Sequence, residues 1–295
     1  MFYRRKLLLG LLEAFDGELD KISLQKLLFL FCNKQGANAE YHFIPYLYGC
    51  YSITANSDIE SLAKANILNS GEKEVKKLDK SNYISKLKAN DKLLLAEVKK
   101  NYGRMNAHTL MQHTYLNFKY YAINSVLAQR ILPNEAYEKI LESRPKREGI
   151  ILHTIGYEGI SLEEYLNKLI RNDIKLLIDV RNNPMSMKFG FSKSQLNAAC
   201  EKIHIEYLHI PEVGIQSEYR QELKTQADYD NLFSIYRKEN LPKTTVQQRR
   251  ILKLLEEKER IALTCFEANV CQCHRKHLAE AIQNLPGWKY ELKHI

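Results

Sequence analysis

The fold is decided by one stretch of the sequence, Ile261-Ala262-Leu263-Thr264-Cys265-Phe266-Glu267-Ala268-Asn269-Val270-Cys271-Gln272-Cys273-His274-Arg275. Residues 261–264 form an apolar run bounded by polar residues, which is the pattern of a buried strand. Residues 275–283 are predicted to form a helix. In open α/β sheets, ligands bind outside the carboxyl ends of the strands, where a strand leads into a helix. The reactive side chains between positions 265 and 275 are therefore the first candidates for a functional site.

A second polar group follows another apolar run. Lys175-Leu176-Leu177-Ile178 leads into Asp179-Val180-Arg181. Each of these two predicted strand ends thus carries a carboxylate with an arginine nearby. If the two strands are neighbours, the groups at their ends share one crevice.

Strands and helices alternate throughout this half of the chain. We expect strands at 153–157, 176–180, 205–210, 260–266 and 288–294, and helices at 162–171, 193–201, 228–238, 245–257 and 275–283. Ser161 is the expected cap of the first of these helices, with acidic residues in its first turn. The alternation predicts an α/β fold with a mostly parallel sheet and flanking helices.

The first half is predicted to be mainly helical. Residues 7–15, 23–31 and 56–65 have helical spacing, and a charged two-stranded wing is expected around 67–84. Further helices are expected at 91–102, 106–115 and 134–141. This order is typical of a winged helix. The charged segment 142–149 contains Pro145 and Gly149, so we place the boundary there, with domains at 1–143 and 150–295.

Composition narrows the class of protein. The chain has 295 residues, of which 45% are hydrophobic and 27% are charged. Its formal net charge is +9. This positive charge favours polyanionic partners, and the alternative is that it only reflects a soluble protein surface. No apolar stretch reaches the roughly 18–20 residues of a membrane span, so no membrane partner is expected. The six cysteines are scattered and the amino-terminal segment lacks a cleavage signal, which indicates a cytoplasmic protein.

Two resemblances follow from these motifs. Residues 24–30, 43–49 and 51–52 are similar to the N-terminal pattern of Panacea and phage-associated antitoxin-like domains, which implies docking of nucleic acid or of a protein partner. The second half resembles a bacterial and archaeal family, the domain of unknown function four-eight-eight. That resemblance rests on four groups of residues: Thr154 to Tyr157; Asp179, Val180 and Arg181 with Pro184 and Ser186; Phe191 and Leu196 before Tyr207 to Pro211 and Gly214; and Cys265, Glu267, Cys273, His274 and Arg275. Met187 before Lys188, and the additional Cys271, depart from the family pattern.

The cysteine cluster allows several chemistries. Cys265, Cys271, Cys273 and His274 are metal-ligand types, but paired zinc ligands are usually separated by two to four residues, and one backbone rarely wraps such close neighbours around an ion. We therefore expect no metal and no cofactor. Cys273 at a helix start beside Arg275 is a candidate nucleophile, since both features lower a thiol pKa. The alternative is that the cysteines are buried packing residues.

The carboxylates give the leading hypothesis. Asp179 and Glu267, with Cys273 and His274, are the candidate catalytic residues. Paired acids beside arginines suit cleavage of a glycosidic bond. Arg181 and Arg275 are expected to clamp phosphates, and Gly156, Tyr157, Pro184 and Ser186 to line the pocket, with Tyr157 stacking on a base. The alternative is that the acids and arginines form structural ion pairs.

These residues predict a hydrolase that acts on nucleic acid. The expected partner is DNA, with RNA or a nucleotide as alternatives. The favoured reaction is removal of a modified base by hydrolysis of its N-glycosidic bond, in defence against foreign DNA, with a duplex base flipped out of the stack. One alternative is a sensor that binds nucleotide or nucleic acid without turnover. Another is a toxin–antitoxin-type protein that docks a partner chain through its N-terminal domain.

Overall fold

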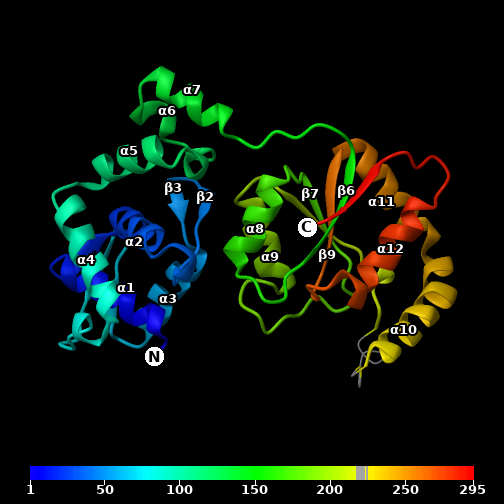
Figure 1. The fold of residues 1–295 in the computed structure, drawn as a ribbon, viewed down its shortest axis with the longest axis horizontal. Coiled ribbons are helices and arrows are strands. Elements are labelled where there is room, and N and C mark those ends of the chain that lie inside the picture. The colour runs from blue at the N-terminus through cyan, green and yellow to red at the C-terminus, as the bar shows by residue number, and fades with distance from the viewer. Residues whose placement is uncertain (217–222, 224) are drawn as a thin grey trace. The chain divides into compact units, whose positions relative to one another are not determined.

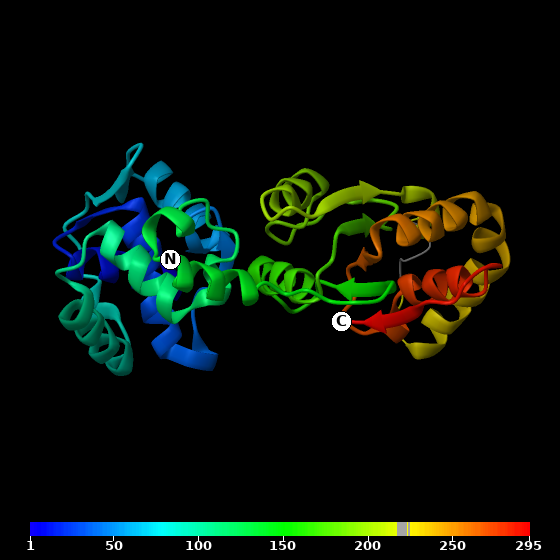
Figure 2. The same ribbon diagram turned by 90° about the horizontal axis from the view of Figure 1, so that it is seen from above.

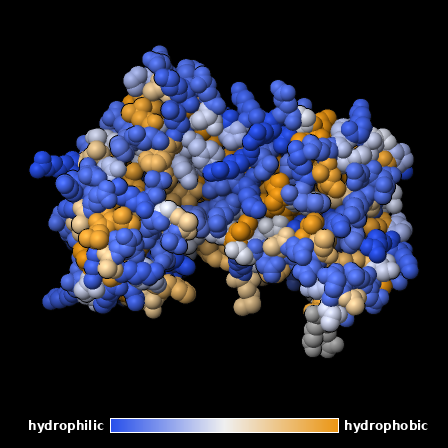
Figure 3. Space-filling model, in the orientation of Figure 1, coloured by the Kyte–Doolittle hydropathy of each residue, from blue (hydrophilic) through white to orange (hydrophobic). Residues whose placement is uncertain are grey.

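The computed structural model describes residues 1–216, 223 and 225–295. The chain separates into two compact units, Met1–Arg144 and Pro145–Ile295, both drawn in Figure 1. The division falls inside the charged segment 142–149. In the described part of the chain no helix has the length and apolar character needed to cross a membrane. The face drawn in Figure 3 is mostly hydrophilic, with separate hydrophobic patches on it.

The N-terminal unit begins with a winged-helix arrangement. Its first elements are α1 (Tyr3–Ala14), β1 (Glu18–Asp20), α2 (Lys21–Gln35), the hairpin β2 (Ile44–Tyr46) and β3 (Gly49–Tyr51), α3 (Ile53–Lys64), β4 (Leu68–Ser70) and β5 (Glu74–Lys77). Strands β1, β5 and β4 form an antiparallel sheet in that order. Asp20 caps α2, because its carboxylate accepts a hydrogen bond from the Ser23 amide at 2.8 Å.

The remaining helices complete this unit. They are α4 (Ala89–Tyr102), α5 (Ala107–Asn117), α6 (Ala128–Ile131) and α7 (Asn134–Glu142). The core is built mostly from the leucines of α1 and the leucines and phenylalanines of α2, which are almost fully buried. The aromatic-rich segment 41–52 contains the β2–β3 hairpin, in which the rings of Tyr46 and Tyr51 stack with their centroids 4.8 Å apart.

The C-terminal unit is an α/β domain. Its elements are β6 (Ile151–Gly156), α8 (Leu162–Arg171), β7 (Leu176–Asp179), α9 (Lys193–Glu201), β8 (Glu206–His209), α10 (Gln226–Ile235), α11 (Thr245–Lys258), β9 (Arg260–Cys265), α12 (His274–Gln283) and β10 (Glu291–His294). The five strands lie in the order β10-β6-β9-β7-β8, and each neighbouring pair is parallel. The predicted fold class is confirmed.

Helices cover both faces of this sheet. Helices α8 and α9 lie on one side of the strands, and α10, α11 and α12 lie on the other (Figure 1). The second face includes Ile178, Val180, Leu263 and Cys265, which pack in one core with residues of α10, α11 and α12. Side chains alternate along a strand, so Asp179 and Thr264 point to the opposite face, toward α8 and α9. Tyr165 of α8 confirms this, since its hydroxyl donates to the Thr264 hydroxyl at 2.7 Å.

An aromatic pair precedes the last strand, which begins at Glu291 and not at Trp288 as expected. Trp288 is the only tryptophan in the sequence. Its ring lies edge-on to that of Tyr290, with centroids 5.5 Å apart, and both pack against the core of the C-terminal unit. Figure 2 shows β10 at the edge of the sheet.

Candidate functional site

The register of the parallel sheet gathers the polar strand ends. Gly156 of β6 is opposite Cys265 of β9, and Asp179 of β7 is opposite both Thr264 of β9 and His209 of β8. The chain beyond β9 crosses close to Gly156, where an added Cβ would overlap the Glu267 carbonyl. The end of β6 is held there because the amides of Tyr157 and Glu158 both donate to the carbonyl of Phe266, at 3.1 and 2.9 Å.

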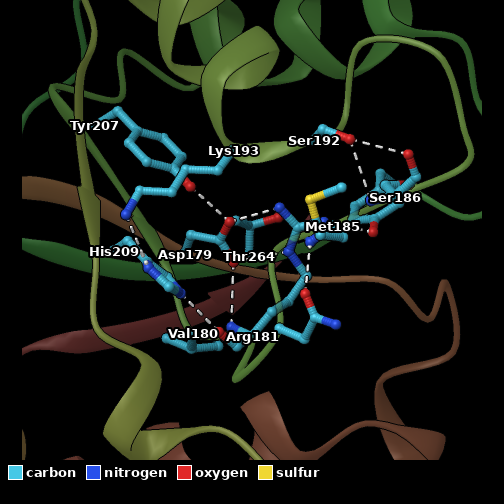
Figure 4. A network of polar contacts seen from close by, with 12 residues as sticks. Asp179, Val180, Arg181, Met185, Ser186, Ser192, Lys193, Tyr207, His209 and Thr264 are labelled. Atoms are coloured by element: carbon cyan, nitrogen blue, oxygen red, sulfur yellow. Dashed lines mark hydrogen bonds and ion pairs between the residues drawn. The ribbon is translucent and has the colours of Figure 1, made fainter. Parts of the chain in front are cut away.

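Asp179 is the centre of a buried polar network (Figure 4). Its Oδ1 accepts from the amide of Arg181 at 3.1 Å and from the Arg181 Nε at 2.8 Å. Its Oδ2 accepts from the Arg181 Nη2 at 2.5 Å and from the Tyr207 hydroxyl at 2.7 Å. The carboxylate is 0% exposed and each of its oxygens accepts two hydrogen bonds. It therefore has the surroundings of a structural anchor.

The same contacts shift the pKa values of the residues that bind Asp179. Burial opposes the charge of Arg181, but hydrogen bonding to Asp179 and its negative charge more than offset this and raise the pKa of the guanidinium above its usual value. Burial, and then the charge of Asp179, raise the pKa of Tyr207. Arg181 also donates from Nη1 to the Tyr157 hydroxyl at 2.7 Å. At neutral pH the network therefore holds a charged pair and two neutral phenols.

Tyr157 does not have the role expected for it. Its side chain is buried, and its ring stacks on that of Phe191 with centroids 4.2 Å apart and planes 10° apart. Because only 2% of the residue is exposed and Phe191 covers one face of its ring, the structure gives Tyr157 a packing role and does not support the prediction that it stacks on a base. The exposed aromatic ring is that of Phe266, which is 41% exposed and lies edge-on to Tyr157.

Glu267 belongs to a different cluster from Asp179. The Cys265 thiol donates to the Glu267 carboxylate at 3.2 Å and lies 3.6 Å from the His274 Nδ1. Cys265 and Cys273 are in the core on the α10–α12 side of the sheet, whereas Asp179 is on the α8–α9 side. The structure therefore brings the two strands together, as expected, but it does not bring the two carboxylates together.

Cys273 has no sign of an activated thiol. It is the N-cap residue of α12 and is fully buried. Burial, followed by its hydrogen bond with Cys265, raises the pKa of Cys273 well above the usual value and outweighs the charge of Arg275. The prediction that the helix start and Arg275 lower this pKa is wrong, because the loss of hydration is the larger effect.

Arg275 holds the loop after β9. Its guanidinium donates from Nη1 to the carbonyl of Glu267 at 2.5 Å and from Nη2 to that of Ala268 at 3.2 Å, and the residue is 2% exposed. Both predicted phosphate clamps are therefore buried and bonded to protein acceptors. Arg181 nevertheless lines the pocket described next, whereas Arg275 does not.

A pocket of about 340 Å³ opens beside the Asp179 network. Its lining combines the basic side chains Arg181 and Lys188 with amide, hydroxyl, thioether and aromatic groups, namely Tyr157, Asn182, Asn183, Met185, Ser186, Met187, Ile215 and Phe266. This volume falls within the roughly 300–1,000 Å³ typical of small-ligand sites. Of the residues predicted to line a pocket, Tyr157, Arg181 and Ser186 do so, and Gly156 and Pro184 do not.

The loop between β7 and α9 supplies most of this lining and is held by its own hydrogen bonds. The Ser192 hydroxyl donates to the carbonyl of Ser186 at 2.9 Å and accepts from the Ser186 amide at 3.2 Å. The carbonyl of Pro184 accepts from the Lys193 amide, and the Lys188 ammonium donates to the carbonyl of Tyr157 at 2.5 Å. Lys188 and Phe266 were not predicted as site residues. For Lys188, the sequence did contain a signal, which is the departure from the family pattern at Met187 and Lys188.

A comparison with known protein families gives one match, in the C-terminal unit. Residues 161–282 match the family described as domain of unknown function DUF488. The match lies in the C-terminal part of the chain and is to the family that the motifs predicted. No curated protein matches the chain. The likeness of the N-terminal unit to antitoxin-like domains stays a prediction.

Proposed function

We propose that the C-terminal unit binds a nucleotide of a nucleic-acid chain, most readily of single-stranded DNA, in the pocket beside Asp179. The observation that carries this proposal is the lining of the pocket, where a lysine and short polar side chains meet an exposed phenylalanine and two exposed methionines. Sites for single strands combine positive charge for the backbone with aromatic faces for the bases.

Each part of a nucleotide has a complementary group there. Lys188 is the basic side chain for a phosphate, with the amides of Asn182 and Asn183 and the hydroxyl of Ser186 as further donors. Phe266 offers an exposed ring, and Met185 and Met187 are largely exposed, so these three suit the flat face of a base. The net charge of +9 and the winged-helix order of the N-terminal unit support a polyanionic partner.

Binding is favoured over hydrolysis by the position of the acids. Cleavage of an N-glycosidic bond needs an acid or a base within hydrogen-bond reach of the reacting group. Asp179 is occupied by Arg181 and Tyr207, and no carboxylate is present among the described residues that line the pocket. Removal of a modified base in defence against foreign DNA is therefore the secondary hypothesis, and it is tested in the same preparation.

The experiment uses the full chain with labelled oligonucleotides of one sequence, as single-stranded DNA, duplex DNA and RNA. Fluorescence anisotropy at low salt is expected to give the tightest binding for single-stranded DNA, and Lys188→Ala is expected to weaken it. A wild-type protein that binds none of the three would overturn the proposal. Chromatography of the same mixtures with modified and unmodified DNA tests for a released base or an abasic site, and either product would establish hydrolysis.

A further inference from the structure

We infer that Cys265, Cys273 and His274 form a zinc site and that Glu267 completes it. The ligand atoms of the first three residues all lie within 4.8 Å of one another. The Glu267 carboxylate is outside that group but contacts the Cys265 sulfur, so it would turn toward the ion on binding. They come from two elements, since Cys265 ends β9, Cys273 caps α12 and His274 begins it. This site is separate from the proposed nucleotide pocket, because none of its four residues lines that pocket.

Two distances from the Cys265 sulfur fit the tetrahedron that zinc prefers. With Zn–S about 2.3 Å and Zn–N about 2.0 Å, two ligands of a tetrahedral ion lie about 3.5 Å apart. The Sγ of Cys265 is 3.6 Å from the Nδ1 of His274, and it is 3.2 Å from the Oε2 of Glu267. A set of two thiolates, one imidazole and one carboxylate is a zinc set by ligand type.

The imidazole of His274 is already oriented for this role. Its Nε2 lies 3.0 Å from the carbonyl of Val180, which can only accept, so Nε2 carries the proton. In that tautomer the lone pair is on Nδ1, which is the atom that faces Cys265. A metal-binding histidine commonly donates its other ring nitrogen to a backbone carbonyl in this way.

The loop between the ligands is held in place by protein contacts. Arg275 donates to the carbonyls of Glu267 and Ala268, the Ala268 amide donates to Glu158 at 3.0 Å, and the Cys271 amide donates to the Asn269 side chain at 2.9 Å. These bonds bend the chain back, so a strand end and a helix start face each other. Close spacing in the sequence argued against an ion, but this reversal supplies the two directions of approach that a straight segment lacks.

Charge and burial also favour a dication. Cys265, Cys273 and His274 are 0% exposed, so two thiolates there need compensation. On binding, both thiols would lose their protons to solvent. The two positive charges of the ion and the one of the Arg275 guanidinium, which acts on Cys273, would then balance the negative charges of the two thiolates and the Glu267 carboxylate. Glu267 is half-buried and contacts the Cys265 sulfur. A closed four-ligand site of this kind ties β9 to α12 and is structural.

The test uses the full-length protein, stripped of metal under reducing conditions and titrated with cobalt(II) and then with zinc. Wild type is expected to bind one ion per chain with the absorption of tetrahedral cobalt bound to thiolates, and zinc is expected to displace it. Cys271→Ser is the matched control, because Cys271 is exposed and outside the cluster, and it should bind as wild type does. Cys273→Ser and His274→Gln should weaken binding by more than the roughly 10- to 100-fold that loss of an outer partner costs.

A measurement on unaltered protein covers the case in which the buried variants fail to fold. X-ray absorption of the zinc-loaded wild type is expected to show two sulfur neighbours and two nitrogen or oxygen neighbours. Absence of thiolate–cobalt absorption in the wild type, a different set of neighbours, or loss of binding in Cys271→Ser would each overturn the inference. Full binding by folded Cys273→Ser would overturn it as well.

Discussion

Arg181 donates hydrogen bonds to both carboxylate oxygens of Asp179, the residue two positions earlier in the chain. The Nε–Oδ1 and Nη2–Oδ2 distances are 2.8 and 2.5 Å, and the two side chains are 6% and 0% exposed. A paired contact of this kind fixes the geometry of both partners more tightly than a single hydrogen bond. The pair therefore sets the course of the chain from β7 into the loop that lines the pocket.

Asp179→Asn is expected to lower the free energy of unfolding by about 3–5 kcal/mol, because it leaves a buried guanidinium without a counter-charge. Urea unfolding of the full chain measures the loss. Tyr207→Phe removes one hydrogen bond to the same carboxylate and is expected to cost only about 1 kcal/mol. Equal stability of Asp179→Asn and wild type would show that the pair is no anchor.

Lys188→Ala and Phe266→Ala are expected to weaken DNA binding in different ways. Loss of a phosphate contact reduces the slope of log K against log salt by about one. Loss of a stacking face costs about 1–3 kcal/mol and leaves that slope unchanged. Anisotropy titrations at several salt concentrations separate the two effects. Lys253→Ala is the matched control, because that lysine is exposed on α11, and a similar loss in the control would contradict a specific role for Lys188.

Gly156→Ala is expected to destabilise the C-terminal unit by about 1–3 kcal/mol, since the new Cβ would overlap the Glu267 carbonyl and push the loop after β9 away. Thermal unfolding followed by circular dichroism measures the change. Gly71→Ala is the control, because its Cβ would meet the nearest backbone atom at an ordinary 3.6 Å. Unchanged stability in Gly156→Ala would mean that the loop moves freely.

His153 is expected to make stability depend on pH. Burial, and then the nearby charge of Arg260, lower the pKa of its ring to about 4, from 6.5 in an unfolded chain. The unfolded state therefore binds the proton first, so this stability is complete above pH 6.5 and is lost as pH falls toward 4. The full effect is about 3 kcal/mol. Urea unfolding between pH 7 and 4 should show a smaller loss in His153→Gln than in wild type, and equal losses would contradict this account.

Most elements of the C-terminal unit could be predicted because their signals are local. The Ser161 cap, with Glu164 at the third helical position, marks the start of α8, and both reciprocal hydrogen bonds of a capping box form there. The apolar runs before Asp179 and Cys265 are the neighbouring strands β7 and β9. A buried parallel strand is apolar on both faces, so these runs do not show which way the next side chain points.

The site could be predicted only in part, because its geometry depends on contacts between distant residues. The register that aligns Asp179 with Thr264 places the carboxylate on the face opposite to Cys265, and nothing in either segment alone gives that register. Tyr157 is buried by Phe191, which is 34 residues further along the chain. For Cys265 and Cys273 the sequence was misleading in the other direction. Their spacing argued against a common ion, but the turn between them brings their sulfur atoms close together.

The position of Trp288 makes the two units separately observable. Its indole packs in the C-terminal core, so tryptophan fluorescence reports the melting of that unit alone, whereas far-ultraviolet dichroism sums the helices of both. Curves from the two probes that fail to superimpose would reveal units that melt one after the other, with no label added to the protein. Zinc, if it binds where the cysteines converge, would then shift the fluorescence curve and leave the other unit's transition where it was.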